Sequence, residues 1–147
     1  MNVEIQGVRV ETDLPRPHPV VLLAPPDAAE WFPVYVGFEE ARAIVRGIDA
    51  VDIGRPLTHD LLLNVVEAFG GRLDDVAVTE QVEETYLADV AFDTPLGAVT
   101  VDARPSDAIA LAARTGTALS VDDDLYERER KHRENFADLD DIREMIR

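Results

Sequence analysis

Residues Val101–Gly116 read VDARPSDAIALAARTG, and this stretch decides the centre of the fold. Pro105 ends a preceding strand, because its ring fixes φ and it has no backbone N–H to donate. Ser106 is expected to cap a helix over Asp107–Thr115, which Gly116 then ends. Since the helical sequence DAIALAART is apolar on almost every side, we expect this helix to be central and buried.

Two further helices are predicted upstream of this stretch. Phe38–Ile48 has apolar residues at helical spacing, namely Ala41, Ile44, Val45 and Ile48. Thr58 is suited to cap the next helix, which Gly70 and Gly71 end. Its apolar stripe consists of Leu61, Leu62, Val65, Val66 and Phe69. Both helices are therefore expected to lay one face on the core.

The remaining pattern predicts strands. The first third has strands at residues 3–10, 19–24 and 31–36, arranged as an antiparallel meander with Pro33 at an edge or bulge. Later strands are expected at residues 73–82, 85–93, 98–103 and 117–121. Because helices and strands alternate irregularly, we predict a single α+β domain with a mixed, largely antiparallel sheet packed with helices. It spans residues 1–125, and residues 126–147 form a charged, solvent-exposed helical tail.

The charge balance is strongly acidic. Thirty Asp and Glu residues face fourteen Lys and Arg residues, and the net charge is −16. Such a surface keeps a protein soluble, and it also fits adaptation to molar salt, where self-repulsion is screened within about 3 Å. We expect the second case, a protein of the halophilic archaeal type. With no broad basic surface, phosphate binding must come from a local Arg cluster or from a metal on carboxylates.

Several protein classes are excluded by what the sequence lacks. It contains no Cys, and therefore no disulfide framework and no thiolate metal site. It has no apolar run near the roughly 18–20 residues of a membrane span, and its first residues do not resemble a secretory signal. We therefore expect a cytoplasmic protein that does not enter the membrane. There is no Gly-rich phosphate loop, dinucleotide fingerprint or nucleophile elbow.

The first segment with chemical potential is Arg55–Leu61, RPLTHDL. It places Arg55, His59 and Asp60 at a helix N-terminus, where backbone N–H groups favour anions such as phosphate. His59 can exchange a proton near neutral pH. The same residues also suit a purely structural role, with Thr58 as cap, Asp60 opposite the helix dipole and His59 on the surface.

The second segment is Asp102–Asp107, DARPSD. Two carboxylates lie five residues apart around a strand-to-helix turn, with Arg104 between them. Turns at the carboxyl ends of strands are common places for active-site groups. A structural role is equally open here, because Ser106 and Asp107 are ordinary first-turn residues and Arg104 can simply pair with either Asp.

Four strings occur in order that together resemble the bifunctional nuclease family: PVVLLAP at Pro19–Pro25, FPVYVGFEEARAI at Phe32–Ile44, RPLTHDLLLNVVEAFGG at Arg55–Gly71 and VDARPSDAIALAARTG at Val101–Gly116. The resemblance covers roughly residues 1–125. It implies nuclease activity on RNA and DNA. It also maps the family's motif residues onto Glu40, Thr58, His59, Asp60, Arg104, Pro105, Ser106 and Asp107.

Under that resemblance, water is the nucleophile, because DNA lacks the 2′-OH. The resemblance implies His59, Asp60 and Asp107 as catalytic residues, with His59 as base or as acid to the leaving oxygen. Arg55, Arg104 and Ser106 would bind substrate. Mg²⁺ or Mn²⁺ would be held by carboxylates, drawn from Glu40, Asp60, Asp102 and Asp107, and no organic cofactor is expected.

A non-catalytic reading stays open at this point. The polar residues of the two segments could instead bind an anion, a nucleotide or a protein partner, or could fix two helix starts without binding anything. A homo-oligomer, most simply a twofold dimer, is also expected, because the apolar strands of the first 36 residues, including Trp31 and Phe32, suggest burial against a second subunit.

Overall fold

The structure, a computed structural model, describes residues 1–13, 15–52 and 54–146. Residues 14, 53 and 147 lie outside these ranges. The order of elements along the chain is β1 (Asn2–Glu11), β2 (His18–Ala24), β3 (Glu30–Tyr35), α1 (Phe38–Ile48), α2 (Thr58–Ala68), β4 (Arg72–Val82), β5 (Thr85–Thr94), β6 (Gly97–Ala103), α3 (Pro105–Thr115), β7 (Leu119–Val121), α4 (Asp123–Glu129), β8 (Lys131–His132), a 3₁₀ helix (Arg133–Phe136), β9 (Asp140–Asp141) and α5 (Arg143–Ile146).

The strands form one mixed sheet in the order β6-β5-β4-β7-β1-β2-β3-β8, and β9 pairs with β1. The pairing of β4 with β7 is parallel, and the other strand pairs are antiparallel. Strand β7 enters beside β4 directly after α3, so α3 makes the crossover onto the sheet. The predicted α+β class with a mixed, largely antiparallel sheet is confirmed.

Strand β1 joins the two halves of this sheet. Its first residues, Asn2 and Val3, pair with β7, and the strand pairs with β2 from Glu4 onward, with a register shift between Ile5 and Gly7. The predicted meander β1-β2-β3 is present. Pro33 sits where β3 has only β2 as a neighbour, since β8 pairs with Glu30 and Trp31, so its edge position is confirmed.

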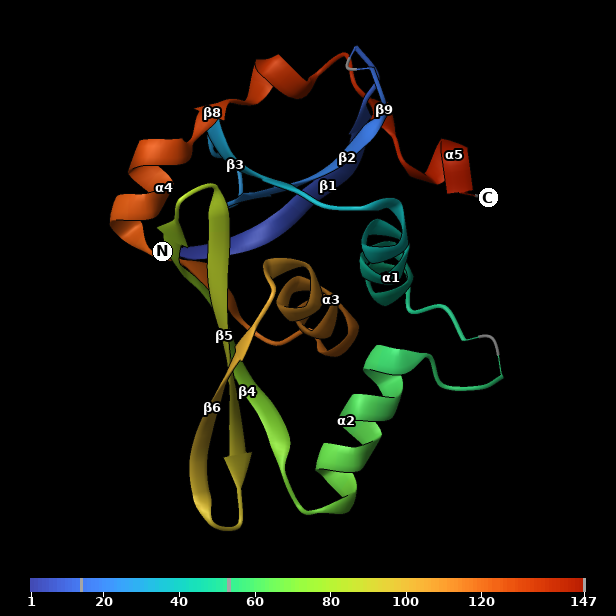
Figure 1. The fold of residues 1–147 in the computed structure, drawn as a ribbon, viewed down its shortest axis with the longest axis vertical. Coiled ribbons are helices and arrows are strands. Elements are labelled where there is room, and N and C mark those ends of the chain that lie inside the picture. The colour runs from blue at the N-terminus through green and yellow to red at the C-terminus, as the bar shows by residue number, and fades with distance from the viewer. Residues whose placement is uncertain (14, 53, 147) are drawn as a thin grey trace.

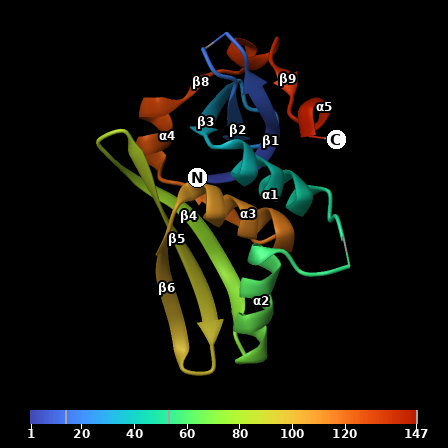
Figure 2. The same cartoon turned by 45° about the vertical axis from the view of Figure 1, so that its right-hand side comes forward.

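Helix α3 occupies the middle of the molecule, with α1 and α2 beside it (Figures 1 and 2). Five consecutive apolar residues, Ala108 to Ala112, are buried, as predicted. A Cβ added to Gly47 of α1 would lie 3.1 Å from Cβ of Ala113, so the two helices cross at close range. Gly116 ends α3 at φ +71°, a conformation that glycine adopts without strain.

The expected N-caps are wrong by one or two residues. Helix α3 begins at Pro105, whose missing N–H costs nothing at a first helical position, and its N-cap is Arg104 and not Ser106. Helix α2 begins at Thr58, its N-cap is Leu57, and the carboxylate of Asp60 accepts the Leu57 N–H at 3.2 Å. The capping role predicted for Thr58 therefore belongs to Asp60.

The apolar stripe of α2 is a second correction. Four of its five predicted members are exposed: Leu61, Leu62, Val65 and Phe69. Val66, the fifth, and Leu63 are partly buried against the core. Amphipathic spacing correctly predicts an apolar face, but most of this face is left uncovered by the residues that the structure describes.

The carboxyl-terminal segment differs from the exposed helical tail predicted for it. It crosses the top of the molecule (Figure 1) and contributes β8 to β3 and β9 to β1. Phe136 is buried and stacks on Trp31 with ring centroids 6.4 Å apart, while Ile142 joins the main core. Trp31 and Phe32, expected at a subunit interface, are buried within the protomer.

Arg143 fixes the far end of this segment. Its guanidinium donates to both carboxylate oxygens of Asp49, just after α1, at 2.8 and 3.1 Å. These hydrogen bonds hold the pKa of Asp49 below its usual value.

No helix within the described ranges is both long enough and apolar enough to cross a membrane.

A second, smaller core cluster consists of Val20, Leu22, Ala24, Trp31 and Phe136. We expect Phe136→Ala to lower the free energy of unfolding by about 3 kcal/mol, because it removes a buried ring from this cluster. Met145→Ala, an exposed position of the same segment, is the matched control and should change it by less than about 0.5 kcal/mol. Chemical denaturation measures both. Equal effects of the two variants would mean that the segment is not part of the cooperative fold.

Candidate functional site

The two predicted segments meet in space, because the first turn of α2 lies across α3. Nε2 of His59 lies 3.0 Å from Oδ1 of Asp107, although the residues are 48 apart in sequence. Both side chains are partly accessible, with exposed fractions of 23% for His59 and 36% for Asp107. The imidazole and carboxylate are thus paired at the surface and not sealed in the core.

Arg104 extends this pair to one side. Its Nε donates to Oδ2 of Asp107 at 2.9 Å, and its Nη1 lies 3.6 Å from Oε1 of Glu40 in the first turn of α1. The hydrogen bond to Asp107 raises the pKa of the Arg104 guanidinium. We name His59, Asp107, Arg104 and Glu40 the polar cluster. It draws on the starts of three helices.

Asp107 is the centre of the polar cluster. Partial burial raises the pKa of its carboxyl, but the hydrogen bonds from Arg104 and then from His59 outweigh burial. The pKa of Asp107 is therefore lowered from its usual 3.8, and the carboxylate is ionised at neutral pH. An ionised carboxylate only accepts hydrogen bonds, so Nε2 of His59 carries the proton in this contact.

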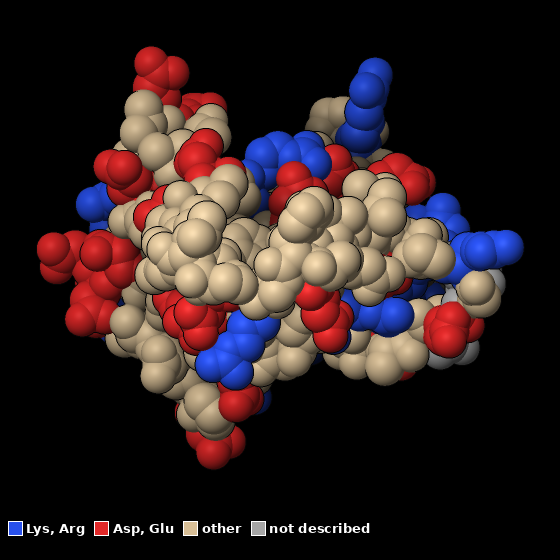
Figure 3. Space-filling view, turned by 90° about the horizontal axis from the view of Figure 1, so that it is seen from below, with Lys and Arg blue, Asp and Glu red and all other residues tan. Residues whose placement is uncertain are grey.

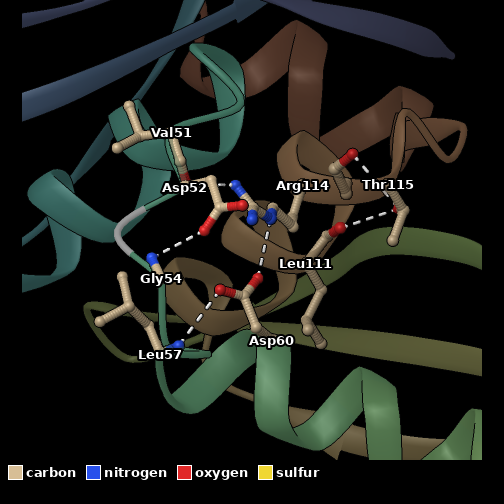
Figure 4. Close-up of polar contacts among 9 residues, drawn as sticks. Val51, Asp52, Gly54, Leu57, Asp60, Leu111, Arg114 and Thr115 are labelled. Atoms are coloured by element: carbon tan, nitrogen blue, oxygen red, sulfur yellow. Dashed lines mark hydrogen bonds and ion pairs between the residues drawn. The ribbon is translucent and has the colours of Figure 1, made fainter.

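Asp60 points away from the polar cluster. Its Oδ1 lies 2.7 Å from Nε of Arg114 at the last turn of α3, and its Oδ2 accepts from Leu57 (Figure 4). Arg114 also donates to the carbonyl of Val51 in the loop between α1 and α2. Asp60 thus fixes the start of α2 and this loop, and both its oxygens are occupied by partners within the protein.

Two other predicted residues also lie outside the polar cluster. Arg55 lines a separate hollow with Asp60 and Arg114. Asp102 pairs across the strands with Asp89, on the face of β6 opposite to Val101, whose partner Val90 faces the core and α3. Side chains alternate between faces along a strand, so Asp102 points away from α3.

A cleft of about 790 Å³ opens beside Arg104. The start of α3 forms part of its wall, including Ser106, which is buried and borders the cleft with Arg104 and Glu40. The charged residues that line the cleft are Glu11, Asp13, Glu40, Glu84, Glu129, Arg104 and Lys131. Five acids against two cations make this cleft unfavourable for a polyanion at low salt.

The four proposed metal ligands do not converge. Asp60 is paired with Arg114, Asp102 faces the other side of β6, and the guanidinium of Arg104 lies between Glu40 and Asp107. Over the parts of the chain that the structure describes, no three His, Asp or Glu side chains are grouped as a metal site requires. The residues present do not fit the carboxylate-held metal that was predicted.

Arg114, which holds the start of α2 in place, is a residue that the sequence analysis missed. It lies seven residues after Asp107, two helical turns along the same face of α3. The neighbours His59 and Asp60 of α2 are therefore held by Asp107 and Arg114 at the two ends of α3. The spacing of Asp107 and Arg114 is visible in the sequence, but their partners are set by tertiary packing.

Comparison with known proteins identifies the class. Residues 21–134 match the family model described as the bifunctional nuclease domain, and the chain belongs to that family. The match includes the whole polar cluster and extends nine residues beyond position 125, where the domain was expected to end.

Individual relatives come from bacteria and plants. An uncharacterized protein found in two strains of Mycobacterium tuberculosis is 37% identical over 122 residues, which cover 83% of this chain and 71% of that protein. Bifunctional nuclease 2 of Oryza sativa and bifunctional nuclease 1 of Arabidopsis thaliana are 28% and 30% identical over 110 residues. Those matches cover 71% of this chain and 34% of each plant protein. These relatives give no support to the expected halophilic archaeal type.

We expect Asp60→Asn to lower the free energy of unfolding by about 2 kcal/mol, because it leaves a partly buried Arg114 without its charged partner. Asp52→Asn is the matched control, since within the described residues the exposed carboxylate of Asp52 accepts only from the N–H of Gly54. Urea denaturation of both variants tests this. If Asp60→Asn is as stable as the wild type, its contact with Arg114 does not hold α2.

Asp107 should also contribute a pH-dependent stability. Because its pKa is lower in the folded state, its contribution is present above about pH 4 and is lost as pH falls through the folded pKa. The stability difference between wild type and Asp107→Asn should therefore shrink as pH falls from 5 to 2.5. Thermal unfolding across this range measures it. A difference that stays constant would show that ionised Asp107 does not stabilise the fold.

Proposed function

We propose that this protein is a nuclease that hydrolyses phosphodiester bonds in RNA and DNA. The observation that carries the proposal is the His59–Asp107–Arg104 array, with contacts of 3.0 and 2.9 Å, in a chain of the bifunctional nuclease domain family. The array combines a proton-transfer group, a carboxylate that orients it and a cation that can hold a phosphate oxygen. These are three groups that hydrolysis of a phosphodiester uses.

His59 is the proposed acid–base residue. Its Nε2 is held by Asp107, so Nδ1 of the neutral ring is left as a lone-pair acceptor for a proton. Asp107 fixes the orientation and tautomer of the ring, as the carboxylate does in other His–carboxylate pairs. Asp107 is therefore a positioning residue in this proposal, and His59 is the group that reacts.

Arg104 is the proposed phosphate-binding residue. Its side chain is 66% exposed; Nε is used by Asp107, and Nη1 lies 3.6 Å from Glu40. The remaining N–H groups can bind phosphate oxygens, and Ser106 at the start of α3 lies beside them in the cleft. Water is the nucleophile, because a shared mechanism for RNA and DNA cannot use the 2′-OH.

The acidic surface sets the conditions under which this activity is expected. A net charge of −16 repels a polyanion in dilute buffer, and salt screens this repulsion. Adaptation to molar salt and a cytoplasmic location stay predictions. Dependence on Mg²⁺ or Mn²⁺ stays a prediction as well, and no step of the mechanism above requires a metal.

A non-catalytic binding or regulatory module is the second function that an observation favours. His59 and Asp60 are held by two residues of one helix, as expected if the polar cluster serves mainly to fix α2 on α3. The five acids of the cleft also favour a cationic or protein ligand over nucleic acid. Activity of point variants separates the two functions.

The test is cleavage of end-labelled single-stranded RNA and linear DNA at 0.1 and 2 M KCl, with Mn²⁺, with Mg²⁺ or with EDTA. We expect the wild type to cut both substrates at 2 M KCl. His59→Ala should lower kcat at least 100-fold, because it removes the proton-transfer group. Arg104→Gln should mainly raise KM.

His18→Ala is the matched control, because His18 is an exposed histidine at the start of β2, remote in sequence from both segments. It should cleave at the wild-type rate. A wild type without cleavage under every condition, or a His59→Ala protein with full activity, rejects the nuclease proposal. Either result leaves the binding module as the better account.

A further inference from the structure

The lower half of the molecule exposes an unusual apolar surface. Six residues of α2, its C-cap and β6, which we name the α2–β6 surface, are each between 44% and 81% exposed: Leu61, Leu62, Val65, Phe69, Val99 and Val101. They expose an area on the order of 600 Å², at the upper end of what a single-chain protein normally leaves bare. Apolar patches of this size normally bind a partner.

The exposed valines of β6 lie on the sheet face that α2 flanks. Val99 and Val101 lie opposite Phe92 and Val90 of β5, which belong to the main core. Val66 of α2 packs against that same core. The exposed valines of β6 thus share a sheet face with α2, which runs beside the β4–β6 strands in both ribbon views (Figures 1 and 2).

The edge of the sheet at β6 is also open. In the described part of the chain β6 pairs only with β5, in an uninterrupted register from Gly97 to Ala103. It has no bulge, proline or lysine, which are among the features that block a free edge, and Asp102 near its end is its one charged residue. The opposite edge, β8, is two residues long and contains Lys131. Of the two edges of this sheet, β6 is therefore the one that is more accessible for pairing with another chain.

The distribution of charge around the α2–β6 surface indicates which kind of chain can bind there. Neither the run LLLNVV at 61–66 nor the run GAVTV at 97–101 contains a charged residue. Viewed from below, uncharged side chains occupy much of the middle of the face, and acidic and basic side chains lie around and between them (Figure 3). Two copies at −16 each repel wherever acidic surfaces meet, so an uncharged surface is where they can approach most closely.

We infer that the α2–β6 surface binds a second copy of this chain and forms a twofold dimer. The available area of about 600 Å² is close to the roughly 800 Å² that each partner contributes to an interface of standard size. An isologous contact needs a self-complementary surface, and an uncharged apolar one meets that condition. This dimer uses a different surface from Trp31 and Phe32, which are buried inside the protomer.

The dimer would also border the polar cluster. Leu62 lies three residues after His59, on the same side of α2. A second copy on the α2–β6 surface therefore covers one flank of His59 and limits access of solvent and substrate from that side. The inference does not depend on the nuclease proposal, since assembly can be measured without activity.

The first test measures mass by light scattering and sedimentation at 0.15 and 2 M KCl. The wild type should have twice the 16.2 kDa mass of one chain, and its dissociation constant should fall as salt screens repulsion. Val65→Glu and Val99→Glu should each raise that constant at least 100-fold. Val82→Glu, at a valine exposed to a similar degree outside the surface, should leave it unchanged.

A second test does not rely on disruptive variants. The chain has no Cys, so Val65→Cys and Val82→Cys each introduce a single thiol. Maleimide should label Val65→Cys more slowly as protein concentration rises, and Val82→Cys at a constant rate. A monomeric wild type at 100 µM in both salts overturns the inference. A dimer in which Val65→Cys reacts at a concentration-independent rate overturns it too.

Discussion

Helix α3 lies buried between the sheet and α1, and both contacts that hold the start of α2 originate on it. Asp107 in its first turn forms a hydrogen bond with His59, and Arg114 in its last turn forms an ion pair with Asp60. Burial of the alanine-rich middle of α3 fixes its position, and the two polar ends transmit that position to α2. The polar cluster exists because a core helix presents its ends to solvent.

The same arrangement explains why the polar cluster supports a chemical role and a structural one. A carboxylate that orients an imidazole for proton transfer also ties two helices together, and the distances are equal in both cases. What separates the roles is exposure: His59 and Arg104 both reach solvent, and Arg104 borders the cleft, while both carboxylate oxygens of Asp60 are occupied by Arg114 and Leu57. We therefore assign a chemical role to His59 and Arg104 and a structural role to Asp60 and Arg114.

Much of this was predictable from sequence, because the deciding patterns are local. The bounds of α1, the meander β1-β2-β3 and the burial of α3 all follow from spacing and from Pro and Gly positions. The meeting of His59 with Asp107 does not follow from local patterns, because tertiary packing brings together two residues that are 48 apart in sequence. The pairing of β8 and β9 was not predictable, because strands of two residues have no periodicity. The exposure of the α2 stripe was missed for a related reason: amphipathicity gives the apolar face of a helix but not what covers it.

The close approach of α1 to α3 at Gly47 and Ala113 has a consequence for how this protein can evolve. A larger side chain at either position moves α1, which carries Glu40, away from the helix that carries Asp107. Fold stability and the geometry of the polar cluster then change together and cannot be selected independently. Substitutions to larger residues that most cores tolerate would, at this helix crossing, cause loss of function.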